Sequence, residues 1–157
     1  EVHLDGSLDF PDSVLAGLDL VVASLHLGSR QSPADRTARL LRVLENPHVD
    51  IVAHPTGRII DRRPPVPCDW KRVFAVAAAS GTALEINANP ARLDLPEELV
   101  REAAGAGVRF TIDSDAHDLA SLDMLRYGVG VARRAGISPD SILNTRDVPG
   151  LLAWLAR

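Results

Sequence analysis

Four short apolar runs alternate with longer amphipathic segments along the chain. The runs span Leu18–Leu25, Val49–Ala53, Thr82–Ile86 and Val108–Ile112. Short runs rich in branched aliphatic residues are typical of buried strands. The segments between them place apolar residues every three or four positions, which is typical of helices that pack on a sheet. Strands that alternate with helices predict a parallel sheet, so the fold class is α/β.

Capping residues set the expected helix boundaries. Ser32 and Pro33 open a helix that Asn46 and Pro47 end, and Gly81 suits the C-terminal cap of a helix over residues 69–80. Further helices are expected over residues 97–104, 119–124, 128–134 and 148–156, the last with Asp147 as its N-cap. The irregular stretch from 55 to 67 is long enough to be a functional loop.

Side chains able to bind a metal follow three of the four predicted strands. His26 follows the first run, His54 the second, and the segment Asp113-Ser114-Asp115-Ala116-His117 the fourth. Because the carboxyl ends of parallel strands open on one face, residues far apart in sequence can meet there. We therefore expect a metal centre with four protein ligands: His26, His54, Asp115 and His117.

The donor types narrow the choice of ion. Imidazole nitrogen and carboxylate oxygen without sulfur favour Zn, Mn or Fe over Mg or Ca alone. Taken singly, each histidine could be a hydrogen-bonded packing residue, and Asp115-x-His117 could be a turn aspartate beside a surface histidine. Three such strand ends in one chain favour the metal interpretation.

A basic loop follows His54. Arg58 could offer a forked donor to a substrate phosphate, and Arg62 and Arg63 extend the positive charge, although a solvated basic loop is the alternative. Asn87 and Asn89 could orient ligands or, more commonly for such residues, cap a turn before Pro90. Two remaining histidines are expected to be structural or solvated: His3 and His48.

Composition restricts the function classes. With 157 residues, 46% of them hydrophobic, the chain has apolar material for one core. Cys68 is the only cysteine, which excludes an internal disulfide and a thiolate cage. The net charge of −4 argues against nucleic-acid binding by bulk charge. No membrane-length apolar run, signal peptide, nucleophile elbow or glycine-rich phosphate loop occurs, so we expect a soluble cytoplasmic protein.

Several motifs in order resemble one family, the PHP (polymerase and histidinol phosphatase) domain, in the version found at the C-terminus of bacterial family X DNA polymerases. The resemblance covers nearly the whole chain, and its number of ordered blocks makes it specific. The blocks lie at residues 5–9 (DGSLD), 22–26 (VASLH), 45–51 (ENPHVDI), 54–58 (HPTGR), 85–90 (EINANP), 115–117 (DAH) and 126–134 (RYGVGVARR).

The resemblance implies a distorted seven-stranded β/α barrel, of which this chain would be the later part, with a multinuclear metal centre that hydrolyses phosphoesters. In the polymerase version it implies a manganese-dependent 3′-5′ exonuclease that meets DNA through the full-length polymerase. His26, His54, Asp115 and His117 match family metal ligands, Asp115 and His117 being the expected catalytic residues. Arg58 is the expected substrate contact, and Mn or Zn the expected ion.

Two departures from the family pattern concern the start of the sequence. The family's early His-x-His motif is absent, so we expect residues 1–157 to form a single PHP domain that is incomplete at its N-terminus. Glu1 also lies closer to Asp5-Gly6-Ser7 than the family's glutamate ligand does, which leaves its role open. Alone, the chain is expected to bind manganese weakly and to be inactive.

Two rival functions remain. One is a free-standing PHP phosphatase that acts on a small phosphate monoester, and the other is a catalytically silent PHP scaffold that stabilises a polymerase. A nucleotidyltransferase region upstream would favour the polymerase, whereas a scaffold would need neither metal nor phosphodiesterase activity. The oligomeric state cannot be read from the sequence.

Overall fold

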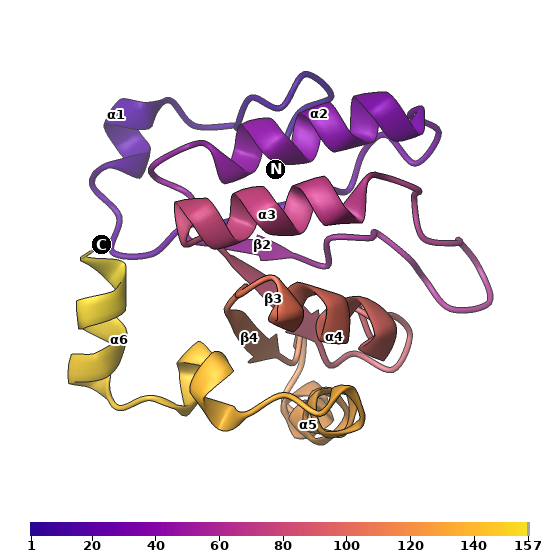
Figure 1. Ribbon diagram of the computed structural model, residues 1–157, viewed down its shortest axis with the longest axis vertical. Helices are drawn as coiled ribbons and strands as arrows, with labels where there is room; N and C mark the ends of the chain where they lie inside the picture. The colour runs from indigo at the N-terminus through magenta and orange to yellow at the C-terminus, as the bar shows by residue number, and fades with distance from the viewer. Residues whose placement is uncertain (157) are drawn as a thin grey trace.

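Four parallel strands form the centre of the computed structural model, which describes residues 1–156. Their order is sequential, β1-β2-β3-β4, and each strand pairs in parallel with the next (Figure 1). Since such crossovers are right-handed, the sequential order places the connecting helices on one face of the sheet. The strands are β1 Val22–Ser24, β2 Ile51–Ala53, β3 Ala83–Asn87 and β4 Phe110–Asp113.

The caps predicted at Ser32, Gly81 and Asp147 are confirmed, whereas Asp69, predicted as the first helical residue, is the N-cap of its helix. Ser32, Asp69 and Asp147 each accept a backbone N–H with the side chain, and Gly81 ends its helix with a φ of 77°. No helix within residues 1–156 is both long and apolar enough to cross a membrane. The helices are α1 Asp12–Leu15, α2 Pro33–Leu44, α3 Trp70–Ser80, α4 Glu97–Gly105, α5 Leu125–Ala135 and α6 Val148–Leu155, with 3₁₀ turns at Ala120–Met124, Pro139–Ser141 and Leu143–Thr145.

The two faces of the sheet differ in character. Side chains alternate along each strand, and one set packs with the helices in the main core: Ala23, Val52, Leu84, Ile86, Phe110 and Ile112. The opposite set is polar near the carboxyl ends of β3 and β4: Glu85, Asn87, Thr111 and Asp113. Nearer the amino ends, Ile51 and Ala83 form a small second cluster with Leu143. The polar half of that face therefore adjoins the predicted site.

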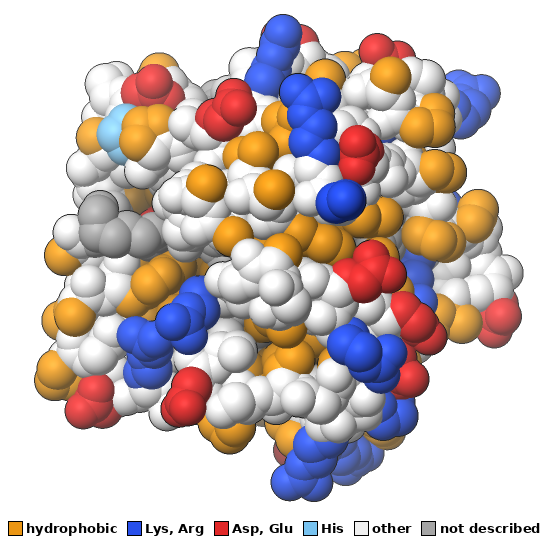
Figure 2. Space-filling model, in the orientation of Figure 1, with side chains coloured by type: hydrophobic (Ala, Val, Ile, Leu, Met, Phe, Trp, Pro, Cys, Tyr) orange, Lys and Arg blue, Asp and Glu red, His pale blue; other side chains and the backbone are white. Residues whose placement is uncertain are grey.

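On the face that carries the helices, the described residues mix charges of both signs (Figure 2). Figure 2 shows acidic and basic side chains interspersed over this face, with apolar side chains between the helices. This distribution agrees with the slightly acidic net charge of −4. Binding of a phosphoester by this chain would therefore depend on local groups rather than on a broad positive field.

The first predicted strand is wrong in its extent. Of the run Leu18–Leu25, only Val22–Ser24 pairs, and Leu18 and Leu20 are exposed. The segment before β1 leaves α1 through a turn. The backbone N–H of Val21 donates to the Asp50 carboxylate at 2.9 Å. The Val21 carbonyl oxygen also accepts the backbone N–H groups of Asp50 and Ile51, so contact between these two segments begins at Val21.

Other boundaries differ by a few residues. The third and fourth strands start later than predicted and end one residue further on, at Asn87 and Asp113. Helix α5 begins at Leu125 rather than Gly128 because it continues directly from a 3₁₀ turn. Asp113 therefore belongs to β4 itself.

The α/β class is confirmed, but a seven-stranded barrel is not. The described residues form four paired strands, with one further backbone contact at each edge of the sheet. At β1, Val2 N donates to Ser24 O at 2.9 Å, and at β4, Phe110 pairs with Ile142 in an isolated parallel bridge. Sequential parallel order is what a β/α barrel requires, although it does not establish closure.

Helix α5 rests on the sheet through a glycine. A Cβ at Gly128 would lie 2.5 Å from Ile112 Cγ2 and 2.9 Å from Ala88 Cβ. We expect Gly128→Ala to destabilise the fold by about 1 to 3 kcal/mol, because the helix must move off β4. Urea unfolding measures this change.

Gly130 on the same helix provides the matched control. A Cβ there would meet only the end of the flexible Arg134 side chain, at 3.4 Å. Gly130→Ala is expected to be neutral or slightly stabilising because alanine has the higher helix propensity. Equal losses of stability in the two variants would contradict the close packing at Gly128.

Candidate metal centre at the carboxyl edge of the sheet

Two of the predicted ligands are in contact. His54 directly follows β2, and His26 lies two residues beyond the end of β1. Because β1 and β2 are parallel neighbours in register, both histidines leave the sheet at the same edge. Their ring centroids are 4.9 Å apart in an edge-to-face arrangement. This part of the predicted cluster is present.

His54 is held in an unusual backbone conformation by a buried acid. Its φ is 33°, and its backbone N–H donates to Glu85 Oε2 at 2.6 Å. The ring is buried, and its Nδ1 has no hydrogen-bond partner within residues 1–156. Burial lowers the pKa of His54 to about 4, with the charges of Arg92 and His26 acting in the same direction. The imidazole is therefore neutral near pH 7, the form that can bind a cation.

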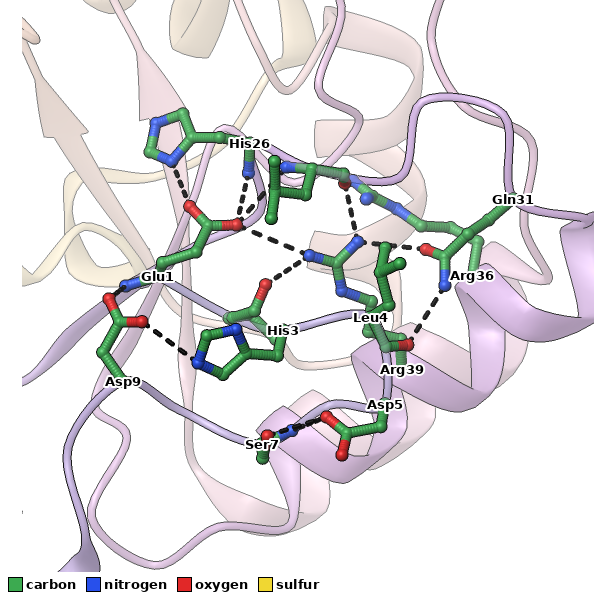
Figure 3. Close-up of polar contacts among 12 residues, drawn as sticks. Glu1, His3, Leu4, Asp5, Ser7, Asp9, His26, Gln31, Arg36 and Arg39 are labelled. Carbon is green, nitrogen blue, oxygen red and sulfur yellow. Dashed lines mark hydrogen bonds and ion pairs between the residues drawn. The ribbon is translucent and has the colours of Figure 1, made fainter.

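Glu1 lies against His26. Its carboxylate is 2.5 Å from His26 Nδ1 and accepts the backbone N–H groups of His26 at 3.0 Å and Leu27 at 3.3 Å (Figure 3). Burial would raise the pKa of Glu1, but these hydrogen bonds outweigh it and lower the pKa. A carboxylate paired with an imidazole fixes the orientation of the ring. The structure thus brings Glu1, which its sequence spacing left undecided, to the candidate site.

A buried arginine fixes the segment that carries Glu1. Arg39 on α2 donates to the carbonyl oxygens of Val2 and Leu27, and to Gln31 Oε1 at 3.0 Å (Figure 3). Its Nη2 is also 3.5 Å from the Glu1 carboxylate. Because Arg39 joins the segment before β1 to the turn after it, Glu1 and His26 are positioned together.

Asp115 and His117 follow β4, as predicted. Asp115 has a φ of 54°, and its carboxylate is 3.3 Å from Arg92 Nε. The negative charge of Asp115 raises the pKa of His54, although burial of the ring has the larger, opposite effect. His117 is exposed, and its Nδ1 lies 2.8 Å from the Asp115 carbonyl oxygen. Asp115 is thus in electrostatic range of His54, whereas placement of His117 beside the imidazoles stays a prediction.

The described residues do not by themselves enclose an ion. Within residues 1–156, no three His, Cys, Asp or Glu side chains are grouped closely enough to hold a metal. The donor chemistry nevertheless fits one, since a neutral imidazole with an unpartnered buried nitrogen adjoins a second imidazole and carboxylates. A protein metal site commonly has three or four such ligands, so the set seen here is partial.

Sequence reasoning missed two residues at this edge, Glu85 and Arg92. Glu85 lies within the predicted apolar run Thr82–Ile86. A single acidic residue near the end of a buried strand could have indicated a site residue. Burial raises the pKa of Glu85 to about 8, and the charges of Asp113 and Asp115 act in the same direction. Hydrogen bonds from His54 and Asn87 lower this pKa but do not outweigh burial. Glu85 is therefore largely protonated at neutral pH. Nothing in the local sequence distinguished Arg92 from other loop arginines.

Arg58 occupies a different environment from the one predicted. Its Nε donates to the Arg92 carbonyl oxygen at 2.6 Å, and its Nη2 donates to the Leu93 carbonyl oxygen. Arg63 similarly donates to the Gly57 carbonyl oxygen at 2.7 Å. These contacts make Arg58 a residue that positions the neighbouring loop, and its predicted contact with phosphate stays untested.

The remaining polar residues of interest have partners or burial that suit structural roles. Asn87 and Asn89 cap turns, since each side-chain oxygen accepts the backbone N–H two residues ahead at 3.0 Å. His3 Nε2 lies 3.1 Å from the Asp9 carboxylate. Burial raises the pKa of the Cys68 thiol to about 12, which leaves it protonated and unreactive.

The raised pKa of Glu85 predicts a pH-dependent effect of Glu85→Gln. The folded protein holds a proton that the unfolded chain, with a pKa near 4.5, releases. The stability that this proton provides is complete below pH 4.5 and is lost as pH rises through about 8. Relative to the parent, Glu85→Gln should therefore gain about 1 kcal/mol or more between pH 5 and pH 8.5 in metal-free urea unfolding. A difference independent of pH would contradict the assignment.

Comparison with known proteins yields related sequences, although no family model matches. The chain is 43% identical, over 98% of its length, to the DNA polymerase/3′-5′ exonuclease PolX of Bacillus subtilis (strain 168). It is 31% identical over 96% of its length to a probable phosphatase of Thermoanaerobacter sp. (strain X514), and 32% identical over 88% to one of Syntrophotalea carbinolica.

The chain spans 27% of the length of the B. subtilis protein and 62% of the Thermoanaerobacter protein. The matched part of the B. subtilis protein is its C-terminal PHP part. The resemblance predicted from the motifs is thereby confirmed: nearly the whole chain is similar to the C-terminal PHP part of a bacterial family X DNA polymerase.

Proposed function

We propose that this chain belongs to a metal-dependent phosphoesterase domain of a family X DNA polymerase and that the domain removes nucleotides from DNA 3′ ends. The observation that carries the proposal is the contact of the neutral, buried His54 with His26 at the carboxyl edge of the sheet, within electrostatic range of Asp115. The similarity to PolX supports the substrate assignment.

The residues that would hold the ion are His26, His54, Asp115 and His117, with Glu1 as an additional carboxylate. Mn or Zn suits this mixture of imidazole and carboxylate donors. When bound, such an ion supplies a water of lowered pKa and stabilises the oxygens of the displacement at phosphorus.

The protein side chains prepare this chemistry before substrate binds. His54 remains unprotonated because it is buried, so no proton must leave before the nitrogen binds. The Glu1 carboxylate orients the His26 ring, and the Arg39 contacts hold Glu1 in place. Asp115 would supply a negatively charged oxygen ligand.

A phosphatase acting on small monoesters is the second candidate, and the similarity to probable phosphatases favours it. The two activities are separated by assaying the full-length protein with manganese on a 3′-labelled DNA strand and on p-nitrophenyl phosphate. Hydrolysis of DNA by preference supports the proposal. Preference for the monoester favours the phosphatase, and inactivity on both supports a silent scaffold.

Asp115→Asn in the full-length protein should lower the rate of DNA hydrolysis by roughly 10²-fold or more, because it removes a charged ligand but preserves shape. Polymerase activity and thermal unfolding should stay close to those of the parent. The rate at saturating manganese measures the effect. Asp123→Asn, at an exposed position in the following 3₁₀ turn, is the matched control. An unchanged hydrolysis rate in Asp115→Asn would remove Asp115 from the site.

A further inference from the structure

Arg92 extends its guanidinium group toward the candidate site. The residue lies on the loop between β3 and α4, and its Nε is 3.3 Å from the Asp115 carboxylate. Its side chain is only 16% exposed, and its charge acts on His54 more strongly than any other single charge does. Arg92 is therefore close to both Asp115 and His54.

The loop that carries Arg92 is fixed by the loop that follows β2. The buried Asp94 carboxylate accepts the backbone N–H of Thr56 at 3.2 Å and its hydroxyl at 2.8 Å. Ile60 N donates to the Ala91 carbonyl oxygen at 2.7 Å. Arg58 adds its contacts to the carbonyl oxygens of residues 92 and 93. Arg92 thus extends from a backbone that hydrogen bonds on both sides hold in place.

The hydrogen bonding of Arg92 is incomplete. Asp115 faces its Nε, whereas Nη1 is enclosed and has no acceptor within residues 1–156. An unpaired buried donor is unfavourable, and a ligand oxygen at this nitrogen would complete its hydrogen bonding. Arg36 and Arg39 also leave Nε unpaired, but each donates through Nη to backbone carbonyl oxygens. Arg58 likewise directs two nitrogens to carbonyl oxygens. Of Arg58 and Arg92, Arg92 is the one suited to accept a ligand oxyanion.

We propose that Arg92 binds a phosphate oxygen of the substrate beside the metal ligands, and that Arg58 acts as its positioning residue. The proposal rests on the phosphoesterase function proposed above. The guanidinium fork matches two oxygens of a phosphoester, and its positive charge balances the carboxylates at this edge. Arg92 would then hold the reacting phosphoester against the candidate metal centre.

Titration of the manganese-loaded full-length protein with inorganic phosphate tests this role. Arg92→Ala should weaken phosphate binding by about tenfold or more, because a charge-assisted contact is lost. The KM for DNA should rise by a similar factor, while manganese affinity stays within about twofold of the parent. Arg92→Lys keeps the charge without the fork and should lose severalfold in phosphate affinity. It also decides the question if Arg92→Ala does not fold.

Arg133→Ala is the matched control because it removes the same charge from an exposed position on α5. It should bind phosphate as the parent does. Unchanged phosphate affinity in the Arg92 variants would overturn the proposal. A joint loss of manganese and phosphate binding would also overturn it, because Arg92 would then only hold Asp115 in position. A parent that hydrolyses neither DNA nor a monoester overturns the phosphoesterase function, whereas the phosphate titration still decides the role of Arg92.

Discussion

A buried carboxylate, Asp94, holds together the two loops on which the candidate site depends. Its oxygens accept the backbone N–H and the hydroxyl of Thr56, so the chain leaving β2 is joined to the chain leaving β3. The side chain is fully buried, and its hydrogen bonds meet the requirement that buried polar groups be paired. His54 precedes one side of this connection and Arg92 precedes the other. This connection acts together with the Glu85 contact to the His54 backbone and the Arg58 contact to the Arg92 carbonyl oxygen.

Electrostatics at this edge depend on burial as much as on charge. Burial keeps His54 neutral and raises the pKa of Glu85 to about 8, while Asp115 is paired with Arg92. A hydrogen bond joins the first two residues, since the backbone N–H of His54 donates to a side-chain oxygen of Glu85. The edge thus combines an unprotonated imidazole, a largely neutral acid and a paired carboxylate within one environment. Such divergent protonation states are common at functional sites.

Much of the fold could be predicted from sequence because its signals are local. Caps at Ser32, Gly81 and Asp147, and apolar runs before His54 and Asp115, depend on neighbouring residues and were correctly interpreted. The contact between His26 and His54 followed from parallel topology. The extent of β1 could not be predicted, because its start lies at contacts between Val21 and Asp50, which are distant in sequence.

Long-range contacts account for the features of the site that could not be predicted. Glu1 reaches His26 across 25 sequence positions, and Arg58 reaches the Arg92 carbonyl oxygen across 34. Both contacts arise from the tertiary arrangement of loops, which leaves no periodic pattern in the sequence. For the same reason, sequence gave no means of choosing between Arg58 and Arg92 as the arginine nearer the ligands.

The central claim is that the carboxyl edge of this sheet is a metal centre built around His54 and Asp115. Anomalous diffraction from crystals of the full-length protein grown with manganese tests it most directly. The account predicts an anomalous peak about 2 to 2.5 Å from an imidazole nitrogen of His54 and from a carboxylate oxygen of Asp115. Manganese bound elsewhere, with no peak within about 5 Å of either side chain, would contradict it.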